Sequence, residues 1–175
     1  TIDAEVTQWK DAEMRALQER IDKLLPRTVN RLSLPWSGQQ PWLLVEAFAD
    51  IQPTLYFLYQ RETGKFIRLG AQRPDLDAKQ LAGMDMVQIP ARDGRSVPAW
   101  LSLPAAGKGK PLPLVVLVHG GPFVRGPSWQ FDAELQFLVA RGYAVLQPQF
   151  RGTQGFGAAH ARAGWRQWGK AMQSD

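Results

Sequence analysis

The sequence contains no cysteine and only two histidines in 175 residues. Without cysteine there is no disulfide scaffold, thiolate zinc site or cysteine nucleophile. Two histidines without an H-E-x-x-H motif are too few for a histidine-rich metal centre, so we expect no metal and no other cofactor. No apolar run reaches 18 residues, which excludes a transmembrane helix within the sequence, and we expect no membrane partner. The compartment, cytoplasmic or periplasmic, and the choice between monomer and homo-oligomer stay open.

Positive charge is concentrated in the second half of the chain. The formal net charge is +5, with 12 basic against 13 acidic residues in residues 1–93 and 9 against 3 in residues 94–175. The arginines of the second part stand singly among apolar and glycine residues, without a basic block or alternating aromatics. This pattern favours a solvated basic face, so we expect no nucleic-acid partner.

Apolar periodicity predicts one helix near the start of the chain. Apolar residues make up 45% of the sequence and charged residues 21%, as is typical of a globular protein. Residues 9–25 place apolar side chains three and four positions apart, with acidic residues early and Lys23 late to suit the helix dipole. Pro26 ends this amphipathic helix. Its apolar stripe is expected to pack against the core rather than to bind a ligand.

Strand patterns follow the helix. Residues 41–69 contain three runs rich in aromatic and branched residues, separated by short polar turns, and they predict an antiparallel meander. A second hairpin is expected over residues 86–104, because Asp93 and Gly94 supply turn chemistry between its two strands.

A different pattern begins after a loop rich in glycine, lysine and proline at residues 105–113. Residues 114–118 form a continuous apolar run, typical of a strand buried on both faces of a parallel sheet. A helical stripe over residues 131–140 and a strand over residues 143–150 complete a βαβ unit. Helical spacing returns in residues 158–172. The fold class is therefore α/β, preceded by an antiparallel segment.

The motif that carries chemistry stands directly after the apolar run and consists of His119, Gly120, Gly121 and Pro122. Two consecutive glycines let the backbone turn sharply and bring N–H groups close to a bound atom, as an oxyanion hole requires. In α/β-hydrolases one oxyanion donor comes from an H-G-G loop of this kind. A plain tight turn is the alternative for this motif taken alone.

The glycine-rich segment after the next strand, residues 150–157, does not indicate a nucleotide site. It contains Gly155 and Gly157, but His160 stands where a dinucleotide fingerprint needs a third glycine. No G-K-[ST] phosphate-binding loop occurs in the sequence. We therefore expect no nucleotide to bind there.

These segments together resemble the prolyl oligopeptidase family of serine peptidases, in particular its dipeptidyl-peptidase and acylaminoacyl-peptidase branches. Four stretches carry the resemblance, in this order: ARDGRSVPAWLSLP, PLVVLVHGGP, GYAVLQPQFRGTQGFG and WGKAMQSD. The resemblance implies that residues 91–175 are the N-terminal part of an α/β-hydrolase peptidase domain, a parallel sheet covered by helices. Residues 1–90 would be the end of a β-propeller domain, with blade-like strands over 41–69 and the helix at 9–25 as an insertion.

The resemblance also implies roles for five residues. Gly121, with Gly120, matches the oxyanion-hole loop, and the backbone N–H of Gly121 would be the donor. His119, Pro122 and Arg151 would shape the surrounding loops. His119 is not expected to be the catalytic histidine, because hydrolases place that residue after the nucleophile in the order Ser, Asp, His.

No catalytic triad is expected within these residues. No serine is flanked by glycines as in G-x-S-x-G, and the resemblance implies that the Ser, Asp and His of the triad follow Asp175. The chain would then be an internal, inactive fragment of a serine peptidase that hydrolyses short peptides through an acyl-enzyme. Two alternatives stay open. One is a carboxylesterase or lipase of the α/β-hydrolase fold, and the other is a non-catalytic interaction module.

Overall fold

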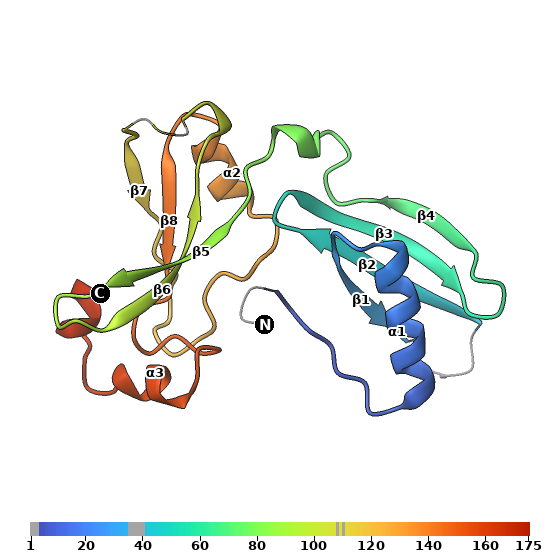
Figure 1. Ribbon diagram of the computed structural model, residues 1–175, viewed down its shortest axis with the longest axis horizontal. Helices are drawn as coiled ribbons and strands as arrows, with labels where there is room; N and C mark the ends of the chain where they lie inside the picture. Colours follow the sequence, from blue (N-terminus) through green and yellow to red (C-terminus); the bar gives the residue numbers. More distant parts are fainter. Residues whose placement is uncertain (1–3, 35–40, 108, 110) are drawn as a thin grey trace.

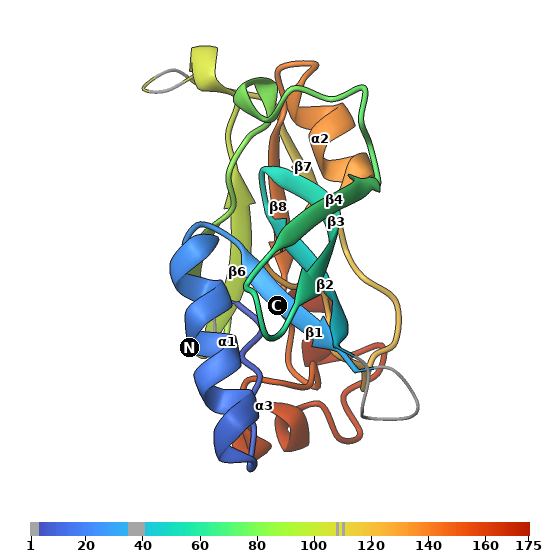
Figure 2. The ribbon, with the colours of Figure 1, turned by 90° about the vertical axis from the view of Figure 1, so that its right-hand side faces the viewer.

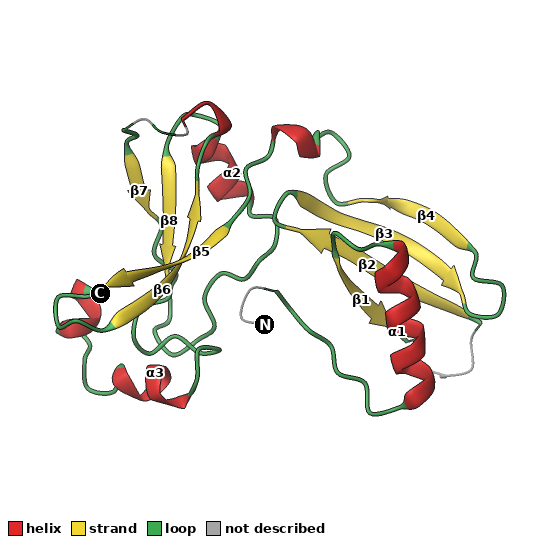
Figure 3. Cartoon of the chain, in the orientation of Figure 1, coloured by secondary structure: helices red, strands yellow, loops and turns green. Residues whose placement is uncertain are grey.

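Two four-stranded sheets form the framework of the molecule. The computed structural model describes residues 4–34, 41–107, 109 and 111–175. The first sheet has the strand order β1-β2-β3-β4, and the second has the order β5-β6-β8-β7. Figures 1 and 3 show the two sheets side by side, with helix α1 against the first and helix α2 against the second.

The first sheet is antiparallel throughout, with each strand paired to the next in the chain. Its strands are β1 (Val29–Ser33), β2 (Trp42–Ala49), β3 (Gln52–Gln60) and β4 (Phe66–Ala71). The predicted meander is therefore confirmed. Strand β1 was not predicted, because its sequence VNRLS carries too few branched and aromatic residues to give a strand signal.

Helix α1 (Ala12–Leu24) covers this sheet and runs along β1 (Figure 2). It begins later than the predicted residue 9, because the Asp11 carboxylate accepts a hydrogen bond from the Met14 N–H at 2.9 Å and so caps the helix. The apolar stripe packs against the sheet as predicted. The buried core of this half consists of Met14, Leu17, Ile21, Leu32, Leu43, Val45 and Tyr59.

The second sheet combines a hairpin with a parallel pair. Strands β5 (Asp85–Pro90) and β6 (Ser96–Ser102) form the predicted hairpin, and β6 pairs antiparallel with β8 (Ala144–Pro148). Strand β7 (Leu114–Val116) pairs parallel with β8, and α2 (Ala133–Val139) connects them. The predicted βαβ unit is confirmed. Its core consists of Met84, Trp100, Leu135, Val139 and Val145.

Strand β7 differs from the prediction in length and in burial. It ends at Val116 rather than at residue 118 and lies at the edge of the sheet. The side chains of Leu114, Val116 and Val118 are 55%, 51% and 61% exposed. Burial on both faces was therefore wrong for the described structure, because an apolar strand is buried only where neighbouring elements cover it.

The last predicted helix is also shorter than residues 158–172. Helix α3 (Ala158–Ala163) ends at Gly164, and turns lead to a 3-10 segment, η3 (Ala171–Ser174). Glycine disfavours the helix interior, which explains the interruption. Two further 3-10 turns are η1 (Ala78–Gln80) and η2 (Ala105–Gly107). No described helix is long and apolar enough to cross a membrane.

Short hydrogen bonds fasten the connector between the two sheets, residues 72–84, at the end that leads into β5. Asp50, at the turn between β2 and β3, accepts a hydrogen bond from the Met84 N–H at 2.8 Å. Gln136 of α2 accepts a hydrogen bond from the Ala82 N–H at 2.9 Å and donates one to the Ala82 carbonyl at 2.7 Å. Only Gly83 lies between the two attached residues.

We predict that Gln136→Ala lowers the free energy of unfolding by about 2 kcal/mol, because both backbone groups of Ala82 lose their partner. Urea unfolding followed by tryptophan fluorescence measures the change. Gln80→Ala is the matched control, since the exposed Gln80 side chain forms no hydrogen bond within the described part of the chain. Equal unfolding midpoints for the two variants would contradict the prediction.

Candidate functional site

His119 holds the loop that follows β7. Its Nδ1 lies 2.7 Å from the Gly120 carbonyl oxygen, and its Nε2 lies 3.1 Å from the Thr153 hydroxyl. Because a carbonyl can only accept, Nδ1 carries the proton and Nε2 accepts from the Thr153 hydroxyl. The imidazole also stacks on Phe150, with ring centroids 4.5 Å apart. One ring nitrogen is therefore engaged within this loop and the other with the segment that follows β8.

This contact orients the peptide bond between Gly120 and Gly121. In a planar trans peptide the carbonyl and the following N–H point in opposite directions. Since His119 binds the Gly120 carbonyl, the N–H of Gly121 points away from that contact. Gly121 has φ +147° and precedes a cis peptide to Pro122. A Cβ at position 121 would lie 3.0 Å from Cγ2 of Val124, so the backbone here requires glycine.

The imidazole of His119 packs against the backbone of Gly126. A Cβ at Gly126 would lie 2.6 Å from Nε2 of His119 and 2.2 Å from Oε1 of the buried Gln149. Gln149 in turn donates a hydrogen bond to the Pro127 carbonyl at 2.8 Å. Sequence reasoning missed Gly126, Gln149 and Thr153 as supports of the loop, because no motif marks contacts that only the tertiary fold creates.

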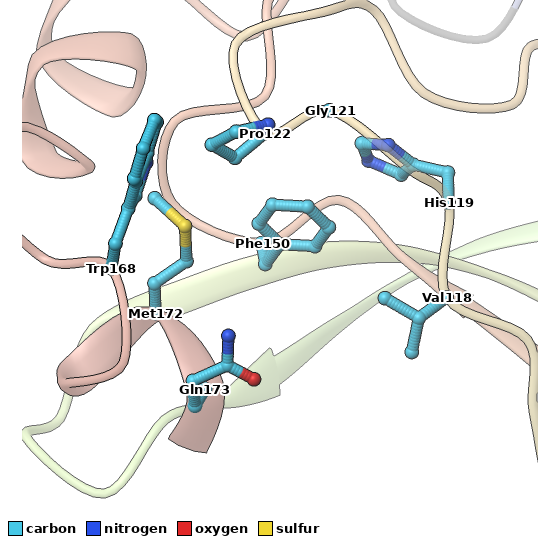
Figure 4. Close-up of a pocket in the computed structure, with 8 residues that line it drawn as sticks. All are labelled: Val118, His119, Gly121, Pro122, Phe150, Trp168, Met172 and Gln173. Carbon is cyan, nitrogen blue, oxygen red and sulfur yellow. The ribbon is translucent and has the colours of Figure 1, made fainter.

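A cavity of about 420 Å³ opens beside this loop (Figure 4). Of the two glycines predicted for the oxyanion hole, Gly121 lines the cavity and Gly120 does not. Figure 4 shows Trp168 and Met172 on one side and His119 on the other, with Phe150 between them. The complete lining consists of Val118, His119, Gly121, Pro122, Phe150, Trp168, Met172 and Gln173. Its surface is mostly apolar and suits an apolar side chain next to a carbonyl group.

Arg151 ties two distant segments to the end of β8. Its guanidinium donates to Asp93 in the turn between β5 and β6, at 2.8 and 3.1 Å, and to both carboxylate oxygens of Asp175. The Arg151 backbone N–H donates to Asp175 as well, at 2.8 Å. The side chains of Arg151 and Asp175 are 7% and 1% exposed, so this ion pair is buried. It fixes the 3-10 segment that carries Met172 into the cavity wall.

The charges of this cluster stabilise one another. Hydrogen bonds to Asp175 and then to Asp93 raise the pKa of Arg151. Hydrogen bonds from Arg151, and then from the backbone N–H of Arg95, lower the pKa of Asp93. The charged forms are therefore favoured at neutral pH. Over the residues that the structure describes, no three His, Asp or Glu side chains are arranged to hold a metal ion.

The end of β8 meets helix α3 through a close contact of two glycines. A Cβ at Gly164 would lie 2.6 Å from Cα of Gly152 and 2.8 Å from Cε of Met172. His160 on α3 is buried, and its Nε2 donates to the carbonyls of Gln149 and Phe150 at 2.8 and 3.0 Å. His160 therefore fastens α3 to the strand end that carries Phe150.

Fold and loop together define an α/β protein with a glycine turn at the carboxyl end of a parallel strand, beside a cavity. The chain belongs to the prolyl oligopeptidase family, and the family model of that description matches residues 129–175. Dipeptidyl aminopeptidase BIII of Pseudoxanthomonas mexicana is 35% identical over 177 residues, covering 96% of this chain and 25% of the relative.

Solved structures share this fold. A puromycin-hydrolyzing peptidase of Mycobacterium tuberculosis is 27% identical, with a TM-score of 0.62 over 75% of this chain and 21% of that structure. The acylaminoacyl peptidase of Pyrococcus horikoshii, at 20% identity, shares the fold with a TM-score of 0.59 over 78% of this chain and 22% of that structure. The chain thus spans about a quarter of the length of its relatives or less.

We predict that Arg151→Gln lowers the free energy of unfolding by about 3 kcal/mol, because it leaves the carboxylate of Asp175 buried without a counter-charge. Chemical denaturation of the full-length protein measures this loss. Arg73→Gln is the matched control, since Arg73 pairs with Asp75 at 3.0 Å on the open surface and is expected to matter little. A loss at position 73 as large as that at position 151 would sink the prediction.

Stability should also depend on pH through Asp93. Its pKa is lower in the folded state than its usual value of 3.8, so its contribution is present above that value and is lost as the pH falls through the folded-state pKa. We therefore expect the gap in unfolding midpoint between the wild type and Asp93→Asn to stay constant from pH 7 to about pH 5 and to close at lower pH. A gap independent of pH would show that the charge of Asp93 contributes nothing.

Proposed function

We propose that the full-length protein is a serine-type peptidase that hydrolyses short peptides through an acyl-enzyme. The observation that carries the proposal is that Gly121 lines a cavity and that its backbone N–H belongs to a peptide plane held by His119. A donor fixed in advance can stabilise the negative charge that develops on a substrate carbonyl oxygen. Membership of a peptidase family supports the choice of substrate.

In the proposed reaction a serine hydroxyl oxygen attacks the substrate carbonyl carbon while a base removes the hydroxyl proton. The carbonyl oxygen becomes an oxyanion and accepts a hydrogen bond from the Gly121 N–H. Collapse of this intermediate expels the amine, which takes the proton from the base, and leaves an acyl ester on the serine. Water then attacks the ester carbon, releasing the carboxylic acid and restoring the serine.

The proposal assigns the whole triad, the serine nucleophile, the histidine base and the aspartate, to residues outside these 175, because no G-x-S-x-G motif occurs in the sequence. The roles of the other predicted residues follow from their contacts. His119 sets the peptide plane, Gly120 supplies the carbonyl that it binds, and Pro122 forms part of the cavity wall. Arg151 holds the strand end beneath them.

The two sheets fit the two domains that this proposal requires. We assign residues 91–175 to the beginning of an α/β-hydrolase domain, and the parallel pair β7 and β8 connected by α2 supports this. Residues 1–90 are assigned to the end of a β-propeller, which the antiparallel sheet of β1 to β4 supports; β5 (Asp85–Pro90), which pairs with β6 in the second sheet, goes with the hydrolase segment instead. Helix α1 belongs with the propeller segment, since its buried face forms part of that sheet's core.

The full-length protein should form one covalent adduct with a fluorophosphonate probe, detected by intact mass, and should hydrolyse dipeptidyl or acylaminoacyl anilides. The isolated 175-residue segment should form no adduct, because it contains no serine in a G-x-S-x-G motif with which the probe could react. A marked preference for acyl esters over peptides would indicate an esterase instead. A full-length protein that forms no adduct would overturn the proposal and favour a binding module.

Gly121→Ala should lower kcat of the full-length protein by about 10²–10³-fold, because the new Cβ meets Val124 and shifts the oxyanion donor. Substrate binding should change less, so KM is expected to stay close to that of the wild type. Gly70→Ala is the control, since a Cβ there meets nothing within 4 Å. Unchanged kcat in Gly121→Ala would rule out this N–H as the donor.

A further inference from the structure

The turn between α3 and η3 presents two indoles and two cations beside the cavity at Gly121. Trp165 and Trp168 are each 63% exposed, which is unusual for such large apolar side chains. They line a second hollow of about 580 Å³ together with Phe123, Arg166 and Lys170. Exposed aromatic residues next to cations are the composition of a binding surface rather than of a solvated turn.

The backbone of this turn is held in an unfavourable conformation. Arg166 has φ +57°, and over the described residues it is the only residue other than glycine with positive φ. Hydrogen bonds from Trp165 N to Arg162 O at 3.0 Å and from Gln167 N to Gly164 O at 3.1 Å keep the turn closed around it. A charged side chain in a left-handed conformation is often retained for a function.

The two cations have no counter-charge in the described structure. Neither Arg166 nor Lys170 forms an ion pair or a side-chain hydrogen bond there, and both are exposed. Asp175, the acidic residue nearest in sequence, is already bound by Arg151. The indole N–H groups of Trp165 and Trp168 likewise donate to no described residue. Over the described residues, the hollow therefore presents positive charge and is lined by two indoles whose N–H groups have no partner, which suits an anionic ligand.

Trp168 connects this hollow to the candidate active site. It lines both the 420 Å³ cavity at Gly121 and the hollow with Arg166 and Lys170. On the hollow side its indole packs against Phe123, with ring centroids 6.0 Å apart. A peptide whose carbonyl lies at Gly121 can thus continue past Trp168 and reach the two cations.

We propose that Arg166 and Lys170 bind a carboxylate group of the peptide substrate, while Trp165 and Trp168 contact the adjoining apolar part of the chain. The inference rests on the proposed peptidase function and adds to it a preference for peptides that carry a negative charge near the scissile bond. The carboxylate comes either from the C-terminus of a short peptide or from an Asp or Glu side chain, since both present the same two oxygens.

The test compares matched peptides on the full-length protein. One pair differs by a free C-terminal carboxylate against a C-terminal amide, and the other by a Glu against a Gln side chain. We expect kcat/KM to be about five- to twentyfold higher for the charged member of one pair, because its carboxylate makes two partly exposed contacts with cations. Added salt should lower this ratio, because it screens exposed charges. The pair that shows the preference identifies the source of the carboxylate.

The double variant Arg166→Gln and Lys170→Gln should bring this ratio close to one. Arg162→Gln is the matched control, because Arg162 is exposed on α3 but does not line the hollow, and it should keep the wild-type ratio. Equal rates for both members of both pairs in the wild type would overturn the proposal. The proposal would also be overturned if Arg162→Gln lowered the ratio of kcat/KM between charged and uncharged peptides as much as the double variant does.

A direct binding measurement separates this inference from the proposed function. Titration with the same peptides, followed by tryptophan fluorescence, should show tighter binding of the charged member whether or not hydrolysis occurs, and Trp168→Phe should reduce the signal. Binding preference without hydrolysis would contradict the peptidase function alone. Hydrolysis without binding preference would contradict the carboxylate site alone.

Discussion

One buried guanidinium group determines the shape of the candidate active site. Arg151 binds Asp93 and Asp175 and thereby fixes the backbone at the end of β8. On either side of it, Phe150 stacks on His119 and Thr153 hydrogen-bonds to the same ring. The histidine in turn holds the carbonyl before Gly121. The direction of a single backbone N–H is thus set by a series of contacts that begins with the ion pairs of Arg151 after the end of β8.

The sequence was most informative where the physical signal is local. Helical spacing located α1, alternation and turn chemistry located the two antiparallel units, and the βαβ unit followed from one apolar run, one helical stripe and one strand. The paired glycines pointed to the loop at Gly121, because backbone conformation there excludes other residues. Each of these features depends on residues within a few positions of one another.

The features that could not be predicted depend on tertiary contacts. The apolar run at 114–118 predicted a buried strand, yet β7 is an edge strand, because burial depends on what lies beside a strand rather than on its composition. For the same reason, the residues that form the cavity wall could not be predicted from the sequence. Trp168 and Met172 line the same cavity as Pro122, and the turn that carries them follows a glycine that packs on Gly152 at the strand end; no periodicity in the sequence shows that packing.

The connector between the sheets has a mechanical consequence. Helix α2 holds Ala82 through Gln136, and the first sheet holds Met84 through Asp50, so Gly83 alone separates the two attachment points. Met84 also packs in the core of the second sheet, so a rotation of one sheet against the other would have to break the hydrogen bond between Met84 and Asp50 or pull Met84 out of that core. The orientation of the two sheets is therefore anchored at three consecutive residues, by a carboxylate from the first sheet and a side-chain amide from helix α2.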